Sequence, residues 1–275
     1  MFRYHTKHLP FYLVAGLLLT TATATADITT GLEVQYAFDN ATTEADLGFN
    51  SVTSVNDSIS GTGTLTQVAG PGGSVGNAAN FGTGSDTRHI DVAGKSSPDA
   101  GSFTFAAWIK APNPNLDRGS VVHGRTGSGD IALLELAAGP PLRANTLVRA
   151  YTPSQITLDR TDSTDFSDDM WHHMAGTWDG GSKVLRLYVD GVISKTSGNG
   201  STGPLNISDF SVGVRTDGVS HAMEGSLADV RMYNRALSDS DVGELFNVVP
   251  EPSGFILAAL ALCGLACRRR RRSIN

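Results

Sequence analysis

The sequence predicts an all-β fold in which two antiparallel sheets pack face to face as a sandwich. Between residues 27 and 249, short runs of alternating apolar and polar residues recur, separated by turns rich in Gly, Asp, Asn and Ser. Such alternation is typical of half-buried strands, whereas helical periodicity is nearly absent from this region. The region is long enough to bury one large core, so we expect a single domain rather than two small ones.

The alternation places individual strands in chain order. Residues 32–38 form the first expected strand, and one face of it carries Leu32, Val34, Tyr36 and Phe38. Residues 40–80, rich in Thr, Ser, Asn and Gly, are expected to hold a long low-complexity loop. In residues 103–109, Trp108 is expected to point away from the face with the two phenylalanines. Further strands are expected at residues 130–136, 146–151, 155–158, 183–189 and 225–233.

Turn and capping residues mark the ends of the later elements. The Asp-Gly pairs at residues 179–180 and 190–191 allow positive φ and predict two successive tight hairpins. Near the end of the domain, Ser238 precedes a short apolar-periodic segment that ends at Phe246. We therefore expect a short helix with Ser238 as its N-cap.

The N-terminal residues have the composition of a secretory signal peptide. Arg3 and Lys7 precede an apolar run at residues 11–19, and alternating alanines follow it. Small residues at this spacing are typical of a cleavage site, so we expect residues 1–26 to be removed by cleavage after Ala26. Cleavage after Ala24 and an uncleaved anchor are the alternatives.

The C-terminal residues 250–275 combine three features in a fixed order. Pro250, Glu251 and Pro252 come first, a 14-residue apolar run at residues 254–267 follows, and five arginines at residues 268–272 come last. The run is shorter than the ~20 residues that span a bilayer comfortably, and arginines favour the cytoplasmic side. The arrangement resembles the PEP-CTERM sorting signal of Gram-negative bacteria, which implies processing by an exosortase-type enzyme. An ordinary tail anchor is the alternative.

Together the two ends predict a protein that is exported to the cell surface or secreted, with a transient hold in the inner membrane and its terminal arginines in the cytoplasm. The whole chain has 21 Lys and Arg and 27 Asp and Glu. Without the two ends, 14 basic and 26 acidic residues remain, a net charge of −12 for residues 27–249. Such a domain is unsuited to nucleic acid or anionic lipid, but its carboxylates could recruit a divalent cation. Both cysteines, Cys263 and Cys267, lie in the tail, so no disulfide is expected.

Three sequence blocks carry a resemblance to a known family. They are the strand block at residues 102–109, the block from Trp171 through the two Asp-Gly turns, and the block at residues 225–238. In this order they resemble the laminin-G-like, concanavalin A-like jelly-roll family over about residues 31–246. The resemblance implies a jelly-roll sandwich for residues 27–249.

The resemblance raises the question of catalysis, because some members of this superfamily are glucanases. Their Glu-x-Asp-x-x-Glu strand places a nucleophile and an acid along one face, and it does not occur in this sequence. His172 and His173 are adjacent in an expected strand, so their side chains face opposite sides and do not suit one metal. Trp108, Trp171 and Trp178 are expected to be core or sheet-covering residues. We therefore expect no enzyme activity.

Polar residues in two loops are the candidate binding residues. Pentraxin-like members bind calcium, and Asp130 and Asp217 match their ligand positions, which makes them the candidate metal ligands. Val214 and Arg215 stand where that pattern has further oxygen ligands, so we expect one weakly bound Ca²⁺ or none. The candidate ligand-binding patch consists of Arg125, Asp130, Arg215, Asp217 and His221, whose groups suit sugar hydroxyls or acidic glycans. Solvated loop residues are the alternative.

Two further sets of carboxylates are possible ion ligands. Asp39 and Asp229 lie near the first and last expected strands and are a candidate pair around a structural ion. A turn cap or a simple surface position is the alternative for Asp39. The acidic stretch at residues 159–169 has a spacing that does not reproduce an EF-hand loop, so a solvated connection is expected there.

These observations predict an exported, non-catalytic glycan-binding or adhesive protein of the bacterial surface, extracellular matrix or biofilm. Its expected partners are an extracellular polysaccharide or glycan and an exosortase-type processing enzyme. Sugar binding rests on the fold, which hosts many functions. One alternative is a structural surface protein that binds protein partners and no sugar. The other is a polysaccharide-degrading enzyme with an unrecognised site.

Overall fold

The computed structural model describes residues 28–248, apart from residues 40, 84, 95–100, 113–117, 126–130, 138–141, 150–154, 159–163 and 198–206. The expected signal peptide with Ala26, the motif Pro250-Glu251-Pro252 and the apolar run therefore lie outside the described residues. Within the described ranges, no helix is long and apolar enough to cross a membrane.

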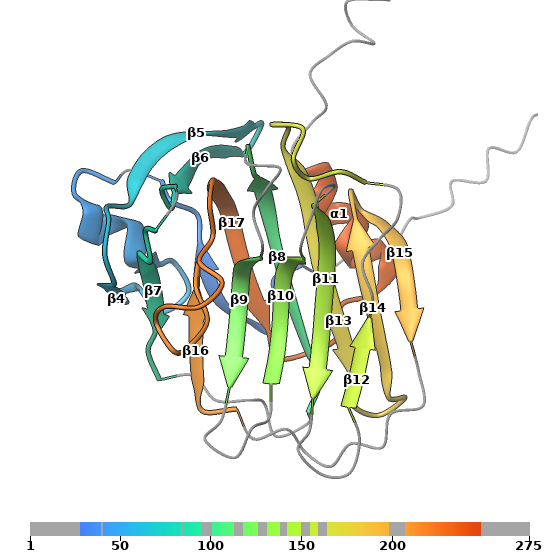
Figure 1. The fold of residues 1–275 in the computed structure, drawn as a ribbon. Coiled ribbons are helices and arrows are strands. Elements are labelled where there is room, and N and C mark those ends of the chain that lie inside the picture. The colour runs from blue at the N-terminus through green and yellow to red at the C-terminus, as the bar shows by residue number, and fades with distance from the viewer. Residues whose placement is uncertain are drawn as a thin grey trace, which may run out of the picture.

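Two large antiparallel sheets pack against each other as a sandwich, as predicted (Figure 1). In spatial order, one sheet contains β15 (Val192–Ser197), β14 (Val184–Val189), β13 (His172–Asp179), β8 (Phe103–Lys110), β17 (Ser226–Tyr233), β6 (Val75–Asn80) and β5 (Thr66–Gly72). An eighth strand, β1 (Leu32–Tyr36), also pairs with β17. The other sheet contains β12 (Gln155–Leu158), β11 (Arg143–Arg149), β10 (Ile131–Ala137), β9 (Gly119–Arg125), β16 (Asp209–Val212), β7 (His89–Val92) and β4 (Ser58–Ser60).

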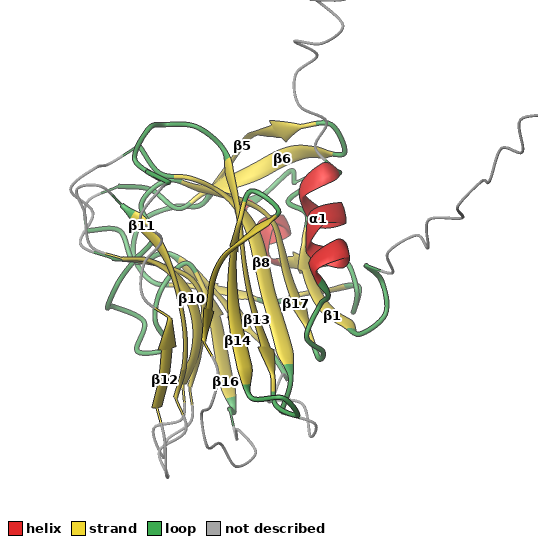
Figure 2. Cartoon of the chain, turned by 90° about the vertical axis from the view of Figure 1, so that its right-hand side faces the viewer, coloured by secondary structure: helices red, strands yellow, loops and turns green. Residues whose placement is uncertain are grey.

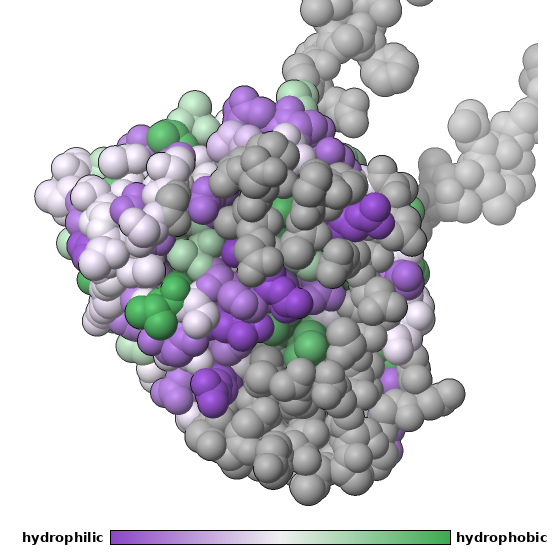
Figure 3. Space-filling model, viewed as in Figure 1, coloured by the Kyte–Doolittle hydropathy of each residue, from purple (hydrophilic) through white to green (hydrophobic). Residues whose placement is uncertain are grey.

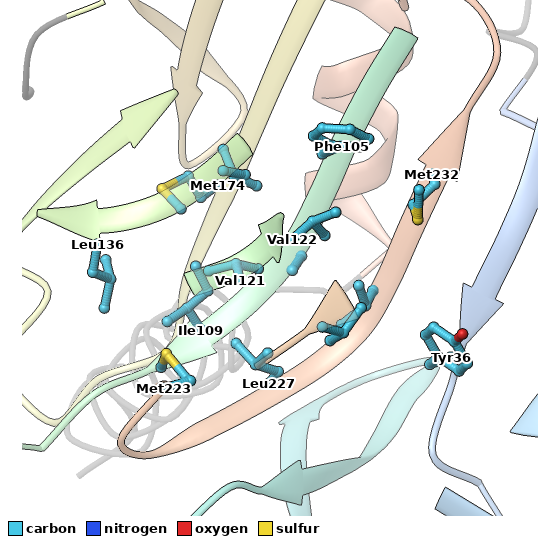
Figure 4. Close-up of a cluster of buried hydrophobic side chains, with 14 of the residues drawn as sticks. Tyr36, Phe105, Ile109, Val121, Val122, Leu136, Met174, Met223, Leu227 and Met232 are labelled. Carbon is cyan, nitrogen blue, oxygen red and sulfur yellow. The ribbon is translucent and has the colours of Figure 1, made fainter. Parts of the chain in front are cut away.

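The inner faces of the two sheets form one continuous apolar core. Side chains such as Phe105, Ile109, Leu136, Met174 and Leu227 point into the space between the sheets (Figure 4). They come from alternate positions of their strands, which is the pattern that the sequence predicts. Burying each large apolar side chain contributes about 1.5–3 kcal/mol, so this core holds the sandwich together without a disulfide.

A helix covers the outer face of the eight-stranded sheet. Helix α1 (Asp239–Asn247) begins as predicted, with the Ser238 hydroxyl accepting a hydrogen bond from the Asp241 backbone N–H at 3.2 Å. Its Phe246 ring stacks on Trp108, with ring centroids 5.4 Å apart, so Trp108 does point away from the central core. Figure 2 shows α1 lying against the eight-stranded sheet, on the side opposite the seven-stranded sheet.

Both ends of the described chain lie on this helix side. Ile28 packs against the apolar cluster that contains Leu245 of α1, and its carbonyl accepts a hydrogen bond from Tyr233 at 3.0 Å. At the other end, the carbonyl of Val248 accepts a hydrogen bond from the Ser74 hydroxyl at 2.8 Å. The outer face of the seven-stranded sheet is therefore remote from both ends.

Two expectations about the early strands are wrong. Leu32 leaves the face of Val34 because the register shifts between these two residues, and Leu32 packs against the cluster under α1 instead. Residues 40–80 are not one long loop. They contain, besides β4, β5 and β6, the 3₁₀ helix η1 (Glu44–Gly48), β2 (Phe49–Asn50) and β3 (Val55–Asn56). The strands in this segment are short or rich in Gly, Ala and Asn, so they carry little apolar alternation for a sequence pattern to detect.

The expected pair of Asp39 and Asp229 is also absent. Asp39 accepts a hydrogen bond from the Asn77 side chain at 2.9 Å. Asp229 lies in an irregularity of β17 with φ 45° and accepts bonds from Arg231 at 2.8 and 2.9 Å and from Gln35 at 2.8 Å. An arginine thus neutralises Asp229 where the sequence suggested an ion.

Candidate functional site

The outer face of the seven-stranded sheet carries buried polar side chains at its centre. On β10, Leu134 and Leu136 point into the core, so Glu135 between them points outward. Asn145 of β11 and Ser120 of β9 lie directly opposite Glu135 in the two flanking strands. Figure 3 views this face and shows hydrophilic side chains gathered across its middle. We call this region the polar face.

The loop between β16 and β17 folds back over the polar face. We call residues 213–223 the crossing loop; it is drawn in orange between these strands in Figure 1. The loop closes on itself through the Met223 N–H, which donates to the Gly213 carbonyl at 2.7 Å. It docks on β9 through the Ser120 N–H, which donates to the His221 carbonyl at 2.8 Å. A second docking bond runs from the Thr216 N–H to Nδ1 of His123 at 3.3 Å.

Glu135 is a buried carboxylate with only one of its two oxygens satisfied. The residue is 1% exposed, and its Oε1 accepts hydrogen bonds from Arg118 at 3.1 Å and from Asn145 at 3.0 Å. Among the described residues, its Oε2 has no hydrogen-bond partner and lies 3.6 Å from Nδ1 of His221. Because an incompletely paired buried charge costs free energy, this arrangement requires an explanation beyond packing.

Two imidazoles of the polar face are held in the neutral form. Burial lowers the pKa of His123 to about 4, and the charge of Arg215 adds to the effect. Burial and the same arginine also lower the pKa of His221, although Glu135 works in the opposite direction. A neutral His123 can accept the hydrogen bond from Thr216, which fits the observed geometry.

The structure brings most of the candidate binding residues together. Arg215, Asp217 and His221 belong to the crossing loop, and Arg125 lies at the exposed end of β9, two residues after His123. Arg125, Arg215, Asp217 and His221 all act electrostatically on the His123 ring, to which the crossing loop is bonded through Thr216. Asp130 lies outside the described residues.

Asp217 organises the turn of the crossing loop. Its Oδ1 accepts backbone hydrogen bonds from Val219 at 3.0 Å and Ser220 at 2.8 Å. Partial burial opposes ionisation, but these bonds and the charge of Arg215 outweigh it and lower the pKa of Asp217 to about 2. The carboxylate is therefore ionised and already engaged at neutral pH.

The described donors do not fit a calcium site. Asp217 uses one oxygen for its own turn and lies beside the cationic Arg215, whereas Ca²⁺ needs six to eight oxygen ligands. No group of three or more His, Cys, Asp or Glu side chains that could hold a metal occurs in the described part of the chain. In the acidic stretch, Asp168 pairs with His172 at 3.2 Å and Asp169 with Lys110 at 3.4 Å, while Asp159 and Asp162 lie outside the described residues.

The adjacent histidines of β13 lie on opposite faces, as predicted. His172 is held between Asp190, 2.9 Å from Nδ1, and Asp168, 3.2 Å from Nε2. His173 is buried on the other side, with its ring 5.3 Å from that of Trp108. The two histidines therefore lie in separate environments, His172 between two carboxylates and His173 against an aromatic ring.

The centre of the polar face consists of residues that the sequence does not single out. Arg118, His123, Glu135 and Asn145 are not among the candidates from the sequence. Arg118 and Asn145 donate hydrogen bonds to Glu135, and His123 accepts a separate one from Thr216. One signal was available in the sequence, because Glu135 is the lone charged residue of the otherwise apolar strand β10. Its partners come from other strands and from a loop, so no local pattern connects them.

The fold and the polar face define a jelly-roll sandwich with one outer face covered by a helix and the other face polar. Residues 83–243 match the concanavalin A-like lectin/glucanases superfamily, and the chain belongs to this superfamily. Part of the chain is similar to the adhesion G-protein coupled receptor V1 of Danio rerio, with 28% identity over 156 residues. That match covers 53% of this chain and 2% of the receptor.

Two solved structures illustrate the similarity of fold. Domain 4 of AbnA, an extracellular arabinanase from Geobacillus stearothermophilus solved with arabinotriose, has a TM-score of 0.57 and 19% identity over 78% of this chain and 98% of that domain. The binding domain of botulinum neurotoxin DC, solved with rat synaptotagmin II, has a TM-score of 0.58 and 14% identity. The latter match covers 81% of this chain and 52% of the toxin domain.

Proposed function

We propose that this chain is an exported, non-catalytic glycan-binding protein and that the polar face is its binding surface. The observation that carries the proposal is Glu135, a buried and half-satisfied carboxylate on an outer sheet face. Around it, arginine, imidazole and amide groups offer both donors and acceptors, which is the combination that sugar hydroxyls require. The AbnA domain supports the proposal, because a domain of the same fold was solved with an arabinose oligosaccharide.

The absence of catalysis is part of the proposal. Hydrolysis of a glycosidic bond by the common mechanisms needs a second carboxylate that faces the first across the bond. The sequence has no glutamate within five residues of another glutamate, so the paired carboxylates of a glucanase strand are missing around Glu135. Turnover of any polysaccharide by the purified protein, lost on Glu135→Gln, would contradict this part.

Binding can be tested on a glycan array with and without Ca²⁺. We expect a defined group of glycans to bind independently of Ca²⁺, because the described donors do not form a calcium site. His221→Ala should weaken binding at least about tenfold by removing a group that faces Glu135. Lys195→Ala, on β15 of the other sheet, is the matched control and should leave binding unchanged. An array without binding, or equal losses in both variants, would refute the assignment.

Export and sorting form the second part of the proposal. The signal peptide, the Pro250-Glu251-Pro252 motif and the arginine cluster support secretion or surface display in a Gram-negative bacterium. Mass spectrometry of the mature protein should show cleavage after Ala26 and loss of the tail at the motif. A mature protein that keeps residues 268–272 in cells with an active exosortase would contradict the sorting signal.

A specific observation favours protein binding as the second candidate function. The hairpin of β2 and β3 exposes Phe49, Val52 and Val55 by 43%, 42% and 57%. Neighbouring exposed apolar side chains are typical of protein contacts. A pull-down partner that is lost on Val55→Asp, together with an empty glycan array, would favour this function over sugar binding.

A further inference from the structure

We propose that the polar face selects anionic glycans, which carry carboxylate or sulfate groups. This inference rests on the proposed function and names the ligand class of the same site. The observation behind it is a contrast of charge, because three arginines from separate segments lie on this face of a strongly acidic domain. Residues 27–249 hold only 14 basic residues against 26 acidic ones.

Three guanidinium groups belong to this face. Arg118 precedes β9 and reaches Glu135, with 36% of its side chain exposed. Arg125 ends β9 with an exposed side chain, and Arg215 belongs to the crossing loop. The charges of Arg125 and Arg215 both act on His123, and those of Arg118 and Arg215 both act on His221. Arg118 and Arg125 thus flank β9 at its two ends, and the crossing loop with Arg215 docks on the same strand between them.

The two carboxylates within this group are already engaged by the protein. Glu135 is buried and accepts hydrogen bonds from Arg118 and Asn145. Asp217 binds backbone N–H groups of its own turn. Arg125, in contrast, makes no side-chain hydrogen bond or ion pair with any described residue, so its guanidinium can receive a ligand. Arg125 therefore offers an accessible positive charge on this face.

One acidic residue opposes this field. Asp209 of β16 lies directly opposite Arg125 in the β9–β16 pair and is exposed. Its Oδ2 accepts a hydrogen bond from the Ser208 hydroxyl at 2.9 Å. Removing this negative charge should strengthen the binding of an anion. An Asp209 variant should therefore change the affinity in the direction opposite to an Arg125 variant.

Arginine is suited to such a ligand by geometry as well as by charge. Its planar guanidinium can donate two parallel hydrogen bonds to a carboxylate or a sulfate. At physiological salt, charges more than about 8 Å apart are largely screened, so the net negative charge of the distant surface does not prevent local binding. The attraction should nevertheless weaken as salt is added.

The inference is tested with pairs of polymers that differ only in charge. Polygalacturonate is compared with the same polymer after reduction of its carboxylates to alcohols, and dextran sulfate with dextran. Affinities are measured by calorimetry or biolayer interferometry at about 50 and about 300 mM NaCl. We expect at least one anionic polymer to bind about tenfold or more tightly than its neutral counterpart, less tightly at the higher salt. The two pairs distinguish carboxylate from sulfate as the recognised group.

Variants locate the effect on the polar face. Arg125→Ala should weaken binding of the anionic polymer about fivefold or more, and Asp209→Asn should strengthen it. Lys195→Ala removes the same charge from the other sheet and should change nothing beyond about twofold. Circular dichroism and the melting temperature of each variant verify that the fold is intact.

Several outcomes would overturn the inference. Equal affinity for the charged and neutral member of each pair, or a preference for the neutral polymers, would refute anion selection while leaving glycan binding intact. Equal losses in Arg125→Ala and Lys195→Ala would show that charge acts at a distance from this face. Binding to no polymer, charged or neutral, would refute the inference and the proposed function together.

Discussion

His172 and His173 are sequence neighbours whose effects on stability should depend on pH with opposite signs. Burial lowers the pKa of His173 to about 4. A hydrogen bond with Asp190 raises the pKa of His172, against its partial burial, and Asp168 adds to the increase. The difference arises because adjacent residues of strand β13 point to opposite faces. The ring of His173 packs against Trp108, whereas the ring of His172 lies between two carboxylates.

The magnitude for His173 follows from linkage between proton binding and folding. An unfolded chain binds a proton at this residue with a pKa of about 6.5, so below that pH the unfolded state takes up protons that the folded state refuses. Stability is fully retained above about pH 6.5 and decreases as the pH falls toward 4. The loss is about 2 kcal/mol at about pH 5 and about 3 kcal/mol at about pH 4.

The assay compares the free energy of unfolding of wild type, His173→Gln and His172→Gln between about pH 4 and about pH 8, from urea denaturation. His173→Gln removes the titrating group, so its stability should fall about 3 kcal/mol less than that of the wild type on acidification to about pH 4. His172→Gln should have the opposite effect. The stability from His172 is fully present below about pH 6.5 and is lost as the pH rises through its raised folded pKa, so this variant is weakest relative to wild type in acid.

Parallel curves for the wild type and His173→Gln would refute the reasoning. A ring titration of His173 by NMR near its ordinary pKa would do the same, because a buried neutral imidazole cannot titrate like an exposed one. Since His123 also has a pKa lowered to about 4, part of the acid sensitivity should remain in both variants.

Three further predictions concern packing and are measured by equilibrium denaturation. Gly176→Ala should destabilise the protein by about 1–3 kcal/mol, because the new Cβ would lie 2.5 Å from the Thr146 hydroxyl between the sheets. Gly76→Ala is its control, since a Cβ there meets nothing within 4 Å and stability should hold. Ser238→Ala should cost about 1 kcal/mol through loss of the helix cap, and an unchanged stability would contradict the capping bond. Phe246→Ala should cost about 2 kcal/mol by uncovering the stacked tryptophan, and tryptophan fluorescence should shift to the red.

The strands with clear apolar alternation could be predicted from the sequence, because their pattern is local. In β14, Leu185 and Leu187 enter the central core while Tyr188 enters the cluster under α1, as their spacing indicates. Leu32 could not be placed correctly, because the register shift before Val34 depends on pairing with β17. The short strands within residues 40–80 could not be predicted for a related reason, because they are determined by pairing with neighbouring strands and not by their own composition.

The polar face was predictable only in part. The sequence suggests Arg215, Asp217 and His221, because loop residues with charged side chains are natural candidates, and the structure places all three in the crossing loop. Glu135 cannot be chosen from the sequence, since its significance depends on burial and on Arg118, Asn145 and His221, which come from three other segments. A charged residue in an apolar strand is the kind of local inconsistency that identifies such a site once its surroundings are known.

Helix α1 lies on the same side of the domain as both ends of the described chain, which determines how the domain can be attached to a surface. Ile28 and Val248 are both held on the helix side, and Figure 2 shows that side opposite the seven-stranded sheet. A surface or partner attached through either end would therefore lie on the helix side of the sandwich and leave the polar face accessible. Several copies fixed to one support could then present their binding surfaces outward at the same time, so that weak single contacts combine into strong attachment.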